Sequence, residues 1–99
     1  MSVVESFVRE FGLSGVRVLG MVYRYVEERG GGRCFTYRGL MGWWSRKGLY
    51  RSIDWHTVER AVRRLAEVGV LKRVFKGRRK VMFCLTDESD AIYQELRGG

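Results

Sequence analysis

Positively charged side chains crowd one short stretch of the sequence, and the chemistry open to them is phosphate binding. Six of the nine residues over 72–80 are Lys or Arg, and Gly77 interrupts them as a turn residue would. Lys and Arg donate hydrogen bonds to phosphate oxygens, and each phosphate that they neutralise releases counterions. The alternative is a solvated charged turn that keeps the edges of a hairpin from aggregating. We predict phosphate contacts from four of these residues: Lys76, Arg78, Arg79 and Lys80.

A second polar set shares one face of a helix predicted over 54–68, for which Asp54 is a suitable N-cap. An apolar stripe at helical spacing marks the buried face of this helix: Val58, Val62 and Leu65. Because successive residues turn by about 100°, polar residues occupy the opposite face: His56, Arg60, Arg63 and Glu67. Arg is suited to reading guanine, since its planar fork can donate to O6 and N7 together.

Some of these polar residues also have an ordinary structural role open to them. Glu59 and Glu67 each lie four residues from Arg63, so an ion pair along the helix is the alternative to DNA contact. His56 is the only His, and a lone His is commonly a surface polar residue. A single His gives little support for a zinc site or for His-based catalysis.

Enzymatic chemistry lacks its usual residue patterns in this sequence. Residues 33–80 hold only three acids, so no carboxylate cluster is available for metal-assisted phosphodiester chemistry. The sequence also contains no phosphate-cradling loop motif and no nucleophile–base pair. We expect a protein that is not an enzyme and needs no cofactor or metal, and no small-molecule effector is identifiable.

The whole positive excess lies in the middle of the chain. The 99 residues carry a formal net charge of +8 and form one domain by length. Residues 33–80 hold fourteen Lys or Arg against three acids, residues 1–32 hold four of each, and residues 81–99 hold one against four. A basic face on a neutral-to-acidic body is an electrostatic footprint for nucleic acid.

The sequence predicts neither a membrane span nor a secretion signal. No uncharged run approaches the ~18 residues that a span needs. Charged residues at positions 5, 9 and 10 interrupt the apolar N-terminal stretch. We expect a cytoplasmic protein, or one of the host cytoplasm if the source is a virus. Asn is absent and Gln94 is the only Gln, which weakly indicates a thermophile.

Periodicity and capping signals give the elements that position these residues. Helices are expected over 1–12, 14–29, 37–47, 54–68 and 88–97. Gly12 and Gly69 end two of them, and Thr36 caps the third. A brief strand is expected over 33–35, and a hairpin over 70–86 because two β-rich runs flank a short loop. The apolar side of the third helix is expected to hold Leu40, Met41 and Trp44.

This order of elements resembles the winged helix-turn-helix family, above all small regulators of the MarR and PadR type from archaea, archaeal viruses or bacteria. Three segments carry the resemblance: the helix and strand over 57–71, the charged tip over 76–80, and the passage into the last helix over 83–88. The implied fold is α+β, mostly α. It is a single winged helix-turn-helix domain over 1–99, with extra N-terminal and C-terminal helices and a small antiparallel sheet of a short strand and the wing hairpin.

The resemblance also implies which residues contact DNA. The helix over 54–68 becomes the recognition helix in the major groove, and the basic wing lies on the backbone or in the minor groove. On that helix the DNA contacts are His56, Thr57, Arg60, Arg63 and Arg64. Residues beside the preceding turn are expected to touch the backbone: Arg38, Arg46, Lys47, Arg51 and Ser52.

The cysteines and tryptophans leave alternatives open. In the winged-helix sheet the short first strand pairs with the last, so the resemblance makes Cys34 and Cys84 neighbours. Cytosolic thiols are usually reduced, but intracellular proteins of hyperthermophiles are an exception, so a disulfide and two free thiols both remain possible. Trp44 is expected in the core, whereas Trp43 and Trp55 stay unassigned between packing and base stacking.

The terminal helices carry more apolar surface than a small winged helix needs, and we predict a homodimer through them. The expected interface residues are Val4, Phe7, Val8, Phe11, Ile92, Tyr93 and Leu96. Two recognition helices about one DNA turn (~34 Å) apart would suit inverted-repeat sites. The alternative is that the N-terminal helix covers the domain's own core.

These expectations favour a sequence-specific regulator of transcription that binds double-stranded DNA. The alternative is a winged-helix module that binds a protein partner in a transcription, replication or division complex, since a fold does not fix a function. The net charge of residues 33–80 favours DNA.

Overall fold

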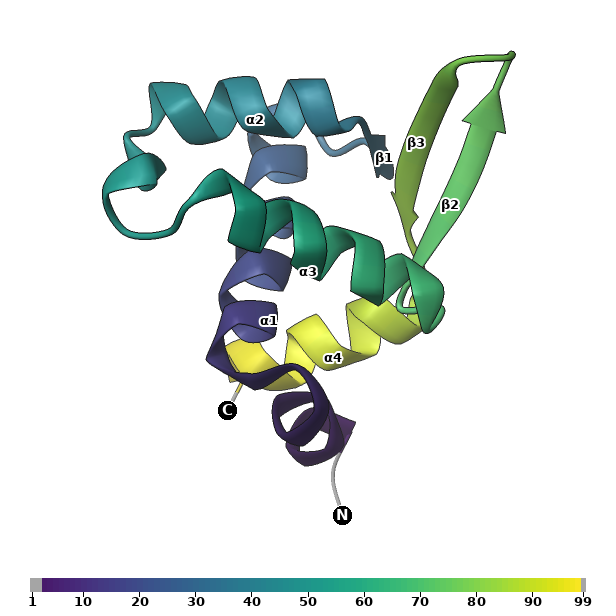
Figure 1. The fold of residues 1–99 in the computed structure, drawn as a ribbon. Coiled ribbons are helices and arrows are strands. Elements are labelled where there is room, and N and C mark those ends of the chain that lie inside the picture. The colour runs from purple at the N-terminus through teal and green to yellow at the C-terminus, as the bar shows by residue number, and fades with distance from the viewer. Residues whose placement is uncertain (1–2, 99) are drawn as a thin grey trace.

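The computed structural model describes residues 3–98, and Figure 1 shows how their elements are arranged. Positions 1 and 2 of the predicted N-terminal helix lie outside the described residues, as does Gly99. The described range is α+β and mostly helical, with a small three-stranded antiparallel sheet. Its elements are α1 Val3–Glu28, β1 Cys34–Phe35, α2 Tyr37–Arg46, the 3₁₀ turn η1 Leu49–Arg51, α3 Trp55–Glu67, β2 Leu71–Lys76, β3 Lys80–Leu85 and α4 Asp87–Gly98.

Helix α1 bends where the sequence predicts a break. Gly12 has φ 69° and ψ −168°, a backbone conformation that is essentially restricted to glycine. The helices predicted over 1–12 and 14–29 are therefore two arms of one bent helix. The first arm lies near α4 (Figure 1). The amide of Val4 donates there to the carboxylate of Glu95 at 3.3 Å.

One apolar core joins the second arm of α1 to α3 and the sheet. Val58, Val62 and Leu65 of α3 are fully buried, so the predicted stripe is confirmed. They belong to one cluster with equally buried residues of α1 and β1: Val18, Leu19, Val22 and Phe35. Asp54 caps α3 as predicted, because its carboxylate accepts from the amide of Thr57 at 3.2 Å.

The buried side of α2 differs from the prediction at one residue. Leu40 is buried and Trp44 packs half-buried against the core, as predicted, whereas Met41 is 40% exposed and Trp43 is buried in its place. Residues three apart lie on the same face of a helix, so Trp43 is buried together with Leu40, whereas the next residue, Met41, points in another direction. The indole of Trp43 donates to Glu28 of α1 at 3.2 Å, so α1 determines which side of α2 is covered.

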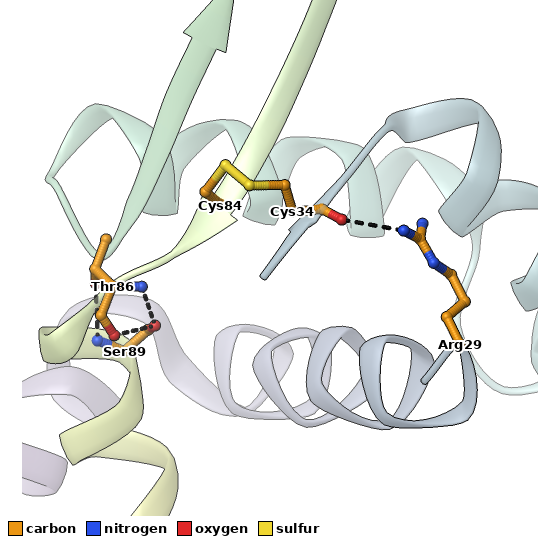
Figure 2. The surroundings of a disulfide bond; sticks show 5 residues. All are labelled: Arg29, Cys34, Cys84, Thr86 and Ser89. Carbon is orange, nitrogen blue, oxygen red and sulfur yellow. Dashed lines mark hydrogen bonds between the residues drawn. A yellow bond between two sulfur atoms is a disulfide. The ribbon is translucent and has the colours of Figure 1, made fainter. Parts of the chain in front are cut away.

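The sheet has the order β1-β3-β2, with β3 in the centre. The brief strand and the hairpin predicted from the sequence are both present. Cys34 and Cys84 face each other across β1 and β3 and are joined by a disulfide, with their Cα atoms 4.0 Å apart (Figure 2). The amide of Leu85 donates to the carbonyl of Arg33 at 2.7 Å. The cysteines therefore occupy the adjacent pair without ladder hydrogen bonds, where facing side chains come closest.

Candidate nucleic-acid interface

An open groove of about 740 Å³ lies between the hairpin of β2 and β3, the start of α2 and one side of α3. We call it the basic groove, because it brings together five cations from three separate segments of the chain: Arg38, Arg63, Arg73, Arg79 and Lys80. Among the described residues that line it there is no Asp or Glu. The rest of its lining is aromatic, aliphatic or hydroxyl-bearing: Thr36, Tyr37, Phe75, Val81 and Phe83. The groove therefore suits an anion that also carries a flat or apolar part.

Strand register explains why the hairpin contributes both charge and rings to this groove. Arg73 pairs with Phe83 and Phe75 pairs with Val81, and residues that pair directly across antiparallel strands project from the same face. At the base of the hairpin this face packs into the core, and Phe83 is only 1% exposed. Further out it forms the groove wall, and Phe75 is 70% exposed.

Arg63 lines the groove, and it also forms an ion pair along α3, which the sequence offered as the alternative to DNA contact. Its guanidinium lies 3.2 Å from the carboxylate of Glu59, and both side chains remain partly exposed. Partial burial raises the pKa of the neighbouring Tyr37, while a hydrogen bond and the positive charge of Arg63 oppose that rise. Tyr37 is therefore a neutral hydroxyl at physiological pH, available to donate to an anion.

The outer face of α3 is only partly open. His56 and Arg60 are exposed near the start of the helix, as the periodicity predicts. Thr57 is half-buried and, with Arg60 and Arg64, lines a second hollow of about 320 Å³ against α1. The guanidinium of Arg64 lies 3.9 Å from Glu10 and over the ring of Phe11. Arg64 is therefore oriented towards α1.

The structure does not bring the four residues around the preceding turn to the groove. Arg46, Lys47, Arg51 and Ser52 lie at the end of α2 and in or beside η1, at the opposite end of α2 from the hairpin (Figure 1). The ammonium of Lys47 is 2.8 Å from Glu28, and this hydrogen bond lowers the pKa of that carboxyl. Arg51 lies over the ring of Tyr50, and the carbonyl of Ser52 accepts from Arg17.

The remaining predicted contacts lie at the hairpin tip, and the tryptophans lie in the core or against it. Lys76 and Arg78 are exposed beside the groove without lining it. Trp55 packs against Trp44, whose indole donates to the carbonyl of Ile53 at 2.9 Å. Trp43 is buried, and Trp44 and Trp55 are partly buried against the core.

Two residues of the predicted dimer interface are buried within the single chain, which corrects that part of the prediction. Phe7 is 4% exposed and Ile92 is 2% exposed, because the first arm of α1 and α4 cover each other. The other five are half-buried against the same chain: Val4, Val8, Phe11, Tyr93 and Leu96.

Sequence reasoning predicted four of the ten residues that line the groove, and the six that it missed include Tyr37, Arg73 and Phe75. The alternation along β2 could have placed Arg73 and Phe75 on one face with the buried Leu71. The proximity of Tyr37 depends on how α2 packs beside the sheet, for which the sequence carries no local signal.

Comparison with protein-family models, with curated proteins and with solved structures finds no match for this chain. Among residues 3–98, no helix combines the length and apolar character needed to cross a bilayer. The same residues contain no group of three or more His, Cys, Asp or Glu side chains placed to hold a metal ion.

Proposed function

We propose that this protein binds double-stranded DNA as a winged helix-turn-helix regulator of transcription. In this proposal α3 is the recognition helix, and its exposed residues His56 and Arg60 face base edges in the major groove. The hairpin of β2 and β3 is the wing, and its cations contact the adjacent backbone. The pairing of β1 with β3 and the order of the elements support this assignment.

The observation that carries the proposal is the convergence of charge in the basic groove. Cations from α2, α3 and the hairpin line one open surface, although 42 positions separate Arg38 from Lys80 in the sequence. Like charges repel, so an arrangement without acidic residues in the lining favours an anionic partner over a purely structural role.

Fluorescence anisotropy with a blunt random-sequence duplex at low salt tests this proposal. We expect Arg63→Gln to weaken binding about tenfold, since a charge-assisted phosphate contact is lost. Arg97→Gln removes the same charge from α4 and serves as the control, with an expected change below about twofold. Equal losses of affinity in the two variants would contradict the assignment of the basic groove as the DNA-binding surface. A wild-type protein that does not bind duplex at ~50 mM salt would contradict the function and favour the protein-partner alternative.

The homodimer predicted from the sequence remains a prediction. The single chain already covers Phe7 and Ile92, so these two side chains are not available to an interface with a second copy. Sedimentation at tens of micromolar protein, without DNA, decides between the two states. A monomer would mean that the first arm of α1 only completes the core, and one chain would then recognise a single half-site.

A further inference from the structure

Phe75 lies on the side of the hairpin that faces the helices, yet no part of the described chain covers it. It is 70% exposed, and it lines the basic groove beside Arg73, Arg79 and Lys80. Burying an aromatic ring is strongly favourable, so a large exposed ring inside a cationic groove indicates a ligand surface.

We propose that the basic groove holds an unpaired nucleotide of a single-stranded segment next to the duplex, with its base stacked on Phe75. The phosphates of this segment lie among the groove cations, which come from the hairpin on one side and from α2 and α3 on the other. This inference rests on the proposed DNA-binding function and specifies the form of DNA that the protein prefers.

The chemistry of the groove favours a single strand over a blunt duplex. A duplex keeps its bases stacked inside, so its backbone reaches the cations but leaves the ring of Phe75 without a partner. A single strand offers both groups together, because each nucleotide carries a phosphate and a free π-face. The groove volume of about 740 Å³ falls within the range of roughly 300–1,000 Å³ that suits small-molecule ligands.

The cations of the groove favour nucleic acid over an acidic protein segment. Four of the five are Arg, whose planar fork matches the oxygens of a phosphate and which also stacks on rings. The guanidinium of Arg73 already lies over the ring of Phe83, 5.9 Å from its centroid. The groove wall therefore alternates charge and ring, as a strand-binding surface does.

The test compares two labelled DNAs that share one duplex, a blunt form and a form with a six-nucleotide single-stranded overhang. We expect anisotropy to give about tenfold tighter binding to the overhang form, the gain of roughly one stacked base. Phe75→Ala should abolish this gain, while Phe75→Trp should keep it. Leu13→Ala is the matched control, since Leu13 is 76% exposed and lies outside the groove.

A second pair of variants separates the groove from the general charge of the tip. Arg79 lines the groove and its neighbour Arg78 does not, so Arg79→Gln should lose the overhang gain and Arg78→Gln should keep it. Equal wild-type affinity for both DNAs would overturn the inference while leaving duplex binding intact. Loss of blunt and overhang binding together in Phe75→Ala would also overturn it, because Phe75 would then be a duplex contact. Overhang binding without duplex binding would support the groove and contradict the proposed function.

Discussion

The carboxylate of Asp90 connects three elements through hydrogen bonds. It accepts from the hydroxyl of Tyr23 in α1 at 2.6 Å and from the guanidinium of Arg33, beside β1, at 2.8 and 3.2 Å. The hydroxyl of Tyr23 also lies 2.8 Å from the hydroxyl of Ser89, and Ser89 is fully buried. Burial raises the pKa of Tyr23, whereas the hydrogen bonds from Arg33 and Tyr23 lower the pKa of Asp90.

This network predicts how stability depends on pH. Because the native pKa of Asp90 lies below the unfolded value, its stabilisation is present above about pH 4 and is lost as the pH falls through the native pKa. Asp90→Asn should lower the Tm at pH 7 and reduce the fall in Tm between about pH 5 and pH 2. Calorimetry over this range measures both effects. Glu67→Gln, which changes an exposed carboxylate on α3, should keep the wild-type pH dependence.

The side chain of Arg60 gives a test of sequence recognition. If it contacts a base edge, Arg60→Ala should cost about 1–3 kcal/mol on the preferred site and much less on other sequences. Selection from a random duplex library, run with wild type and variant, compares the preferred sequences directly. The same preference in both proteins would mean that Arg60 contacts only the backbone.

At the scale of the elements, the features that depend on residues close in sequence were predicted correctly. A feature that depends on packing between distant segments was not. The break at Gly12, the cap at Asp54 and the hairpin depend on residues close in sequence, and all three are confirmed. The face of α2 was predicted in part: Leu40 is buried, but α1 selects Trp43 over Met41 through a contact fifteen residues away. Apolar periodicity cannot choose between two apolar neighbours on a short helix.

The bend of α1 gives a paired prediction on glycine. Gly12→Ala should destabilise the protein by about 1–3 kcal/mol, because an L-residue is strained at that φ and ψ although its Cβ would meet no atom within 4 Å. Gly20→Ala also meets no atom within 4 Å, and at a regular helical position it should stabilise by about 0.5–1 kcal/mol. Urea denaturation of both variants measures the difference. Equal effects would show that Gly12 is not held in this conformation.

The disulfide fastens β1 to the central strand of the sheet and gives a prediction on stability. It joins residues 50 positions apart, and constraining the unfolded chain in this way stabilises by about 4 kcal/mol in the chain-entropy model. Reductant should therefore lower the free energy of unfolding of wild type. The double variant Cys34→Ser, Cys84→Ser should match the reduced protein and not respond to reductant. If reductant did not change the free energy of unfolding of the wild-type protein, this prediction would be contradicted.

At the scale of the molecule, the sequence located the charge but not the surface that it forms. The cations of residues 33–80 were evident from composition, and four of the five in the groove were predicted as contacts: Arg38, Arg63, Arg79 and Lys80. The groove itself arises where α2, α3 and the hairpin meet, so no single segment encodes it. For the same reason the positions of Lys47 and Arg64, each paired with a carboxylate of α1, were not foreseen.

The same convergence of charge determines how binding should respond to salt. If the five groove cations neutralise five phosphates, log K should fall with log salt at a slope of about −4.5 on duplex DNA. Affinity would then drop about 500-fold between 50 and 200 mM salt. Arg63→Gln should make the slope shallower by about one, whereas Arg97→Gln should leave it unchanged. A wild-type slope shallower than about −2 would mean that most of these cations do not contact the backbone, and the basic groove would then not be the DNA-binding surface.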